Sequence, residues 1–171
     1  YYKNCTMTLK ELIDRTPISY GYWTGERGNS KFVVTDEGIE KYLQNGGFKD
    51  INSDREIIKS LFKKYRINGI KYKNGIPDFS PVCEFSTKIT EPLTGEFENN
   101  WPVLHKILAE AMSKKKYLGK TDWTNKDVKD YVSKNWLVLH ESIDGKVQLV
   151  HSYLHNGLFT HCGLRASIRN S

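Results

Sequence analysis

The sequence predicts an α+β fold, and two kinds of pattern favour this class. Apolar residues recur at helical spacing in Ser53–Tyr65 and in Glu98–Tyr117, which is typical of amphipathic helices. Short apolar runs such as Trp136–Leu139 and Val147–Val150 are instead bounded by turn residues, which is typical of strands. With 171 residues, of which 38% are hydrophobic, the chain is long enough to bury a core of its own.

The first 70 residues are expected to form an α/β accessory lobe, domain 1–70. A short helix around Leu9–Ile13 ends before Pro17. The glycine-rich stretch Tyr20–Ser30 is predicted to be a loop, and it leads into a strand at Lys31–Val34. A helix at Asp36–Gln44 is stopped by two glycines, and the longer amphipathic helix follows it.

Residues 71–171 form the second predicted domain. It opens on a strand at Ile70–Tyr72 and a segment, Ile76–Pro81, in which two prolines fix an extended or turn-rich backbone. A strand is expected at Val82–Ile89, before the long helix. Thr124 is expected to begin a further helix, whose buried side includes Val128.

Four of the five histidines follow in a short stretch of sequence. The apolar run Trp136–Leu139 ends in His140-Glu141, and Asp144-Gly145 is a strong signal for a two-residue turn. The return strand is followed by Ser152, an expected N-cap for a helical turn that carries His155. Strand, turn, strand and helix with several imidazoles can place a general base beside a divalent metal ion.

The spacing leaves open which histidines would share a metal ion. His155 and His161 are six residues apart, so they come together only if the helical turn breaks, near Gly157. His151 and His155 are four apart and would share a face if the helix began at His151. Neutral imidazole suits zinc or nickel, whereas an adjacent carboxylate, here Glu141, also suits magnesium or manganese.

Asp78 is the acid of the proline-containing segment, and two roles are open to it. It could accept hydrogen bonds from its own turn, or it could orient a metal-binding histidine from outside the ligand set. His151 is a second residue that could take such an outer role.

Composition limits the classes of function that remain. The formal net charge is +6, which is compatible with binding a polyanion. The three cysteines form no CxxC pair, which argues against a structural zinc site built on thiolates. No apolar run is long enough to span a bilayer. The chain begins at Tyr1 without a signal-peptide pattern, so we expect it to be a piece of a longer protein.

Four blocks of the chain carry a family resemblance. NGIPDFSP at Asn74–Pro81 resembles an N-G-x-P-D-F-S-P signature, LHESIDGKVQLV at Leu139–Val150 a W-H-[HE]…D-x-x-x-x-Q-L-V hairpin, and HNGLFTHCG at His155–Gly163 an H…H-x-G tail. YWTGERGNSKFV at Tyr22–Val33 is similar to a segment that often precedes these domains. In this order the blocks resemble the HNH/endonuclease VII superfamily nucleases of bacterial polymorphic toxins, in the Trp-His-His subgroup.

The resemblance implies a ββα-metal (His-Me finger) nuclease core and hydrolysis of phosphodiester bonds with one divalent ion. By this resemblance, His140 acts as general base, with Glu141 beside it as a ligand or orienting group. His155 and His161 are the expected metal ligands. A competing assignment makes His140 a ligand and leaves the role of base to another group. The metal could be zinc, magnesium, manganese or nickel.

The resemblance also implies a biological setting, that of a toxin tip of the contact-dependent inhibition type. The substrate is expected to be DNA, with a preference for DNA over RNA left open. Delivery is expected from the C-terminal part of a larger secreted or cell-surface toxin, with action in the cytoplasm of the target cell. A cognate immunity protein, small and acidic, is expected to cover the basic cleft.

Four positions depart from the family pattern: Leu139 replaces the motif tryptophan, Glu141 the second histidine, His151 a proline and Cys162 a glycine. Glu141 matters most, because a carboxylate is a poor base near neutral pH but a good metal ligand. Two further hypotheses therefore stand beside the nuclease. One is a catalytically degenerate module of the same fold that binds nucleic acid or a partner, and the other is a structural domain stabilised by zinc.

Overall fold

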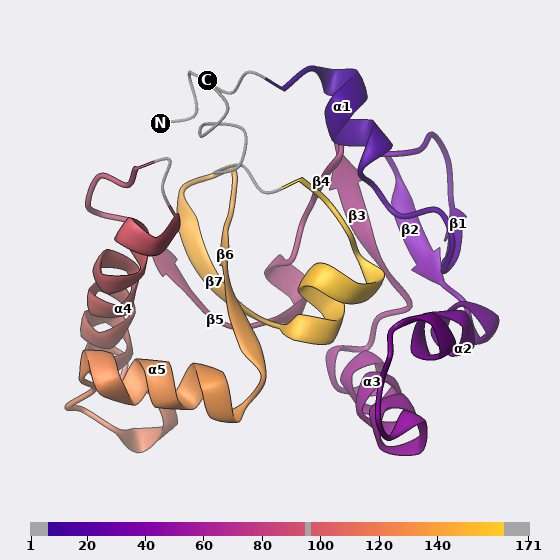
Figure 1. The fold of residues 1–171 in the computed structure, drawn as a ribbon. Helices are drawn as coiled ribbons and strands as arrows, with labels where there is room; N and C mark the ends of the chain where they lie inside the picture. The colour runs from indigo at the N-terminus through magenta and orange to yellow at the C-terminus, as the bar shows by residue number, and fades with distance from the viewer. Residues whose placement is uncertain (1–6, 95–96, 163–171) are drawn as a thin grey trace. The chain divides into compact units, whose positions relative to one another are not determined.

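The computed structural model describes residues 7–94 and 97–162 and contains helices and two small antiparallel sheets (Figure 1). The α+β class predicted from the sequence is therefore confirmed. The described residues form two compact units. The N-terminal unit comprises Met7–Val82 together with Ser152–Cys162, and the hairpin unit comprises Cys83–His151. The sequence predicts a boundary after residue 70, whereas the chain leaves the N-terminal unit at Val82 and returns to it at Ser152.

The sheet of the N-terminal unit has the strand order β1-β2-β3-β4 and is antiparallel throughout. Its strands are β1 (Gly21–Trp23), β2 (Lys31–Val34), β3 (Gly69–Lys73) and β4 (Ile76–Pro77). Phe32 of β2 is fully buried and lies opposite Trp23 on one side and Ile70 on the other. The prediction of a loop over Tyr20–Ser30 is wrong for β1, because pairing with β2 makes these three residues an edge strand.

The N-terminal unit also contains three helices and two short helical turns: α1 (Leu9–Asp14), α2 (Asp36–Asn45), α3 (Ile51–Tyr65), η1 (Ser80–Val82) and η3 (Tyr153–Leu158). The α3 helix begins at Ile51, and the carboxylate of its N-cap residue, Asp50, accepts a hydrogen bond from the Ser53 amide at 3.1 Å. It begins two residues before the predicted start. Arg55 of α3 forms an ion pair with Glu40, which ties α3 to α2.

The glycine-rich loop after β1 is held by Arg27. Its guanidinium donates hydrogen bonds to the carbonyls of Asp14 and Thr16 and to the Thr16 hydroxyl, at 3.0–3.1 Å. The guanidinium therefore fixes the loop against the C-terminal end of α1 and the residues just after it, which is a structural role.

The hairpin unit contains a three-stranded antiparallel sheet in the order β5-β7-β6. Its strands are β5 (Cys83–Lys88), β6 (Leu137–Glu141) and β7 (Lys146–His151). The β6–β7 loop spans four residues, from Ser142 to Gly145, rather than the two predicted. The Gly145 amide donates to the Ser142 carbonyl at 3.1 Å, and Gly145 has a φ of 79°, which glycine adopts at little cost.

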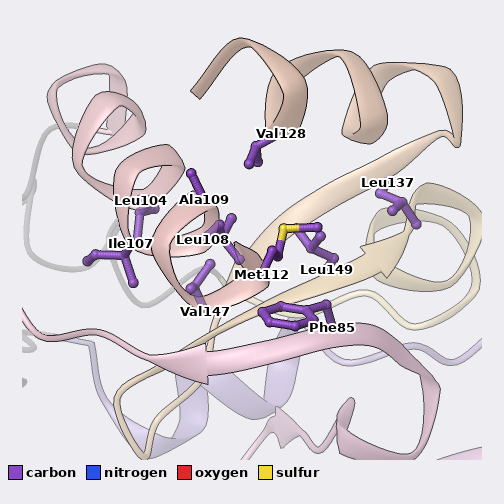
Figure 2. Packing of buried hydrophobic residues seen from close by; sticks show 10 residues of the cluster. All are labelled: Phe85, Leu104, Ile107, Leu108, Ala109, Met112, Val128, Leu137, Val147 and Leu149. Atoms are coloured by element: carbon purple, nitrogen blue, oxygen red, sulfur yellow. The ribbon is translucent and has the colours of Figure 1, made fainter. Parts of the chain in front are cut away.

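Helices α4 (Phe97–Lys114) and α5 (Asn125–Lys134) pack against one face of this sheet, and a single turn, η2 (Tyr117–Gly119), connects them. Figure 2 shows their core side chains directed toward the strands. The fully buried members come from α4, from α5 and from the central strand β7: Leu104, Leu108, Met112, Val128, Val147 and Leu149. Over the residues that the structure describes, no helix combines the length and the hydropathy required to cross a membrane.

Candidate metal centre

The segment that carries His155 is one turn of π-helix, η3, rather than an ordinary α-helical turn. Ser152 occupies the position before it, but its side chain makes no capping hydrogen bond, so the predicted capping role is wrong. Instead, the amide of Phe159 donates to the carbonyl of Leu154 at 3.3 Å, five residues back. Single π-helical turns are rare and occur frequently at functional sites.

The wide turn and the chain reversal after it bring His155 and His161 together. Their ring centroids are 4.8 Å apart, and the ring planes are perpendicular. At least one nitrogen of each ring lies within 4.8 Å of a nitrogen of the other. The sequence predicts that this pair requires a break near Gly157, and the helical turn ends one residue further on, at Leu158.

Phe79 packs against both imidazoles. Its ring centroid lies 5.5 Å from that of His155 and 5.4 Å from that of His161. Phe79 is only 1% exposed, so it forms an apolar wall beside the pair. Sequence reasoning considered only the acid of the IPDFSP block, although a buried aromatic between two prolines is a signal that could have identified Phe79.

Asp78 itself is exposed, and its carboxylate accepts a hydrogen bond from the Ser80 amide at 2.9 Å. This bond spans two residues and is the local turn contact that was one of its two predicted roles. It holds the turn that precedes η1 and places Phe79 in the interior.

The ring of His161 has a fixed proton arrangement. Its Nδ1 lies 3.1 Å from the carbonyl oxygen of Phe159. Because a carbonyl only accepts, Nδ1 must donate its hydrogen, and Nε2 is then the nitrogen with the lone pair. Metal-binding histidines in proteins are usually held in this way, by a hydrogen bond from the nitrogen that does not bind the metal.

Burial keeps both imidazoles neutral. It lowers the pKa of His155 to about 3, with a smaller contribution from the neighbouring His161. Burial also lowers the pKa of His161, and the hydrogen bond to Phe159 opposes this only in part. Neutral imidazole is the form that binds metal ions, so the environment favours the ligand state at neutral pH.

His140 belongs to the hairpin unit and is 7% exposed. In the β6–β7 pair it lies opposite Gln148, which lies opposite Ser86 of β5. Residues two apart on a strand share a face, so His140 lies on the face opposite Leu137, which packs into the helix-covered core. A polar row of Ser86, Gln148 and His140 therefore crosses the face of this sheet that is turned away from α4 and α5.

Glu141 is the next residue and is 6% exposed. Because side chains alternate along a strand, Glu141 lies on the face of Leu139 and Val147, opposite to that of His140. Consecutive positions on a regular strand thus direct the imidazole and the carboxylate to different sides of the sheet. His151, the last residue of β7, lies opposite Leu137 in the same register.

His140, His155 and His161 are the described residues whose side chains could together hold a metal ion. A donor set of imidazoles alone fits zinc or nickel better than magnesium, which prefers oxygen ligands. The neutral state of the partly buried His155–His161 pair supports the same assignment.

Comparison of the chain with protein-family models, with curated proteins and with solved structures gave no match.

Proposed function

We propose that this protein is a metal-dependent endonuclease that hydrolyses phosphodiester bonds in DNA. The observation that carries the proposal is the partly buried, neutral His155–His161 pair, which follows directly after a β-hairpin that bears a third histidine. The order β6, β7, η3 along the chain is strand, strand and one π-helical turn, which resembles the order strand, strand, helix of a ββα-metal core. The formal charge of +6 favours a polyanionic substrate.

In this proposal, His155 and His161 bind the metal ion, and His140 is the general base. The ion would stabilise the negative charge that develops on the phosphate and on the leaving oxygen. His140 removes a proton from the attacking water, and Phe79 excludes bulk water from beside the pair. The competing assignment, with His140 as a third ligand, predicts a different effect of its removal on metal affinity.

Glu141 takes no direct part in our proposal, because strand alternation directs it away from His140. In this proposal, the replacement of the second motif histidine by Glu141 therefore does not remove the general base, because His140 takes that role. The catalytic role of Glu141 that the family resemblance implies is tested by measuring plasmid cleavage by the Glu141→Gln variant.

The biological setting that we propose is the one implied by the family resemblance. The domain would be delivered as part of a larger bacterial toxin and would cut DNA in the cytoplasm of a competing cell. The producing cell would be protected by a small acidic immunity protein. These proposals rest on the sequence blocks together with the positive charge of the chain.

The test is plasmid cleavage by the purified protein, with chelator and then with zinc, nickel, manganese or magnesium. His140→Ala and the double variant His155→Ala/His161→Ala should abolish cleavage. His105→Ala is the matched control, because His105 lies on α4 and outside the candidate ligand group. A parallel incubation with RNA measures the preference between the two nucleic acids.

The same experiment separates the rival functions. Binding of DNA without cleavage under every metal supports the degenerate binding module, and unfolding on chelation without any effect on DNA supports the structural zinc domain. Metal affinity of His140→Ala, measured by titration calorimetry, then assigns its role. Unchanged affinity identifies a base, and a large loss identifies a ligand.

A further inference from the structure

The conformation of the segment Tyr153–His161 is not stable in isolation. One π-helical turn of six residues makes few internal hydrogen bonds, and isolated short helices are unstable in water. The positions of His155 and His161 must therefore come from contacts with the rest of the N-terminal unit. Those contacts are made by residues that lie one or two positions from each histidine in the sequence.

Behind His161, two contacts fix the chain. The hydroxyl of Tyr72 donates a hydrogen bond to the carbonyl of Thr160 at 3.0 Å. The ring of Phe159 is fully buried between Phe32 and Phe62, with centroid distances of 6.3 and 6.4 Å. The backbone on the N-terminal side of His161 is thus held by one hydrogen bond and by aromatic packing.

Around His155, the contacts come from α2 and α3. Gly157 lies so close to Tyr42 that an added Cβ would be 2.4 Å from the tyrosine hydroxyl. At the start of η3, the hydroxyl of Tyr153 donates a hydrogen bond to the carboxylate of Asp54. The ring of Tyr153 also packs on Phe48, with 5.8 Å between the centroids.

The bond between Tyr153 and Asp54 differs from the others in kind. Its acceptor is a carboxylate, and hydrogen bonds with one charged partner are shorter and stronger than neutral ones. It joins the first residue of η3 to the first turn of α3, across 99 positions of sequence. It is therefore the contact best able to set the position of η3, and of His155 with it, against α3 within the N-terminal unit.

We propose that Asp54 and Tyr153 are positioning residues that hold His155 in its metal-binding orientation. This inference rests on the proposed metal site and deepens it. It assigns a role to the N-terminal lobe, since α3 would provide the support for a metal ligand that lies near the other end of the described chain. Neither Asp54 nor Tyr153 touches the metal in this proposal.

The probe is Co²⁺, whose visible absorption reports the number and geometry of its ligands. Tyr153→Phe removes only the hydroxyl, and Asp54→Ala removes only the acceptor. Tyr131→Phe is the matched control, because its hydroxyl makes a 2.9 Å hydrogen bond with Tyr117 in the hairpin unit, far in sequence from both histidines. Asp54→Asn retains an acceptor oxygen without the charge.

We expect Tyr153→Phe and Asp54→Ala to weaken Co²⁺ binding about tenfold or more and to change its spectrum, as loss of an outer partner does in metal sites. Asp54→Asn should recover part of the affinity, and Tyr131→Phe should bind Co²⁺ like the wild type. Wild-type affinity and spectrum in Tyr153→Phe, with only a lower unfolding midpoint, would overturn the inference and leave a purely structural role.

The failure of this inference is distinguishable from failure of the proposed nuclease function. If the wild type binds Co²⁺ and the variants weaken it, but no metal supports DNA cleavage, the positioning role stands and the nuclease proposal falls. If cleavage occurs and Tyr153→Phe binds Co²⁺ like the wild type, the nuclease stands and the positioning role falls. A wild-type protein that binds no Co²⁺ overturns the positioning role.

Discussion

His155 and His161 meet edge to face, with 4.8 Å between their ring centroids and Phe79 against both rings. This relationship lies wholly within the N-terminal unit. Two neutral, partly buried imidazoles side by side make an environment in which protonation of either ring is unfavourable. That environment has a consequence for stability as well as for metal binding.

The first prediction is that the metal-free protein loses stability in mild acid. The pKa of folded His155 is about 3, whereas an unfolded histidine has a pKa of about 6.5. Between these pH values the His155 imidazole is protonated in the unfolded chain but not in the folded one. The free energy of unfolding therefore falls as the pH falls. The contribution is fully present above a pH of about 6.5.

Urea unfolding in chelator, at about pH 7.5 and about pH 5, measures this loss. His155→Gln removes the titrating group and should reduce the difference between the two midpoints. The explanation fails if the variant and the wild type show the same dependence on pH.

The second prediction concerns Gly157. An added Cβ would lie 2.4 Å from the Tyr42 hydroxyl and 2.8 Å from its Cζ, so Gly157→Ala should destabilise the fold by about 1–3 kcal/mol. Tyr42→Phe removes the closest atom, and the double variant should therefore recover part of the loss. Thermal unfolding of the four proteins in this double-mutant cycle tests the coupling, and strict additivity would contradict it.

The third prediction is a stabilising change at Arg66. This residue ends α3 with φ 53° and ψ 47°, a left-handed conformation that costs residues with a Cβ about 1–2 kcal/mol. Arg66→Gly should therefore raise the free energy of unfolding by about 0.5–1 kcal/mol, because glycine adopts this conformation readily. Arg66→Ala keeps the strain and should show no gain. Chemical denaturation distinguishes the two.

The fourth prediction compares two leucines of the hairpin unit. Leu108 of α4 is fully buried, and Leu108→Ala should lower the free energy of unfolding by about 2–5 kcal/mol. Leu118 is 69% exposed, so Leu118→Ala should change the free energy of unfolding by less than about 0.5 kcal/mol. Equal effects of the two substitutions on the urea midpoint would show that the core is not where the structure places it.

The elements that the sequence predicts well are those whose signals are local. The α5 helix begins after Thr124 as expected, because Thr124 and Asp127 form a reciprocal capping box. The apolar stripe of α3 and the apolar run of β7 are also properties of a short window. In each case the residues that determine the element lie within it.

The parts that the sequence does not predict depend on partners far along the chain. The edge strand β1 exists because Tyr22 pairs with Val33 across a glycine-rich loop, and no pattern in three residues reveals that. The π-helical turn departs from its predicted capping because its anchors are Asp54 and Tyr42, which lie on α3 and α2. The spacing of His155 and His161 predicts that they meet only if the helical turn breaks near Gly157.

The N-terminal unit is assembled from two separated pieces of chain, and this has a consequence during protein synthesis. A ribosome makes Met7–Val82, then the whole hairpin unit, and only then Ser152–Cys162. A nascent chain therefore lacks both His155 and His161 until translation has passed every other described element. The candidate metal pair is therefore completed only after every other described element of the N-terminal unit has been synthesised.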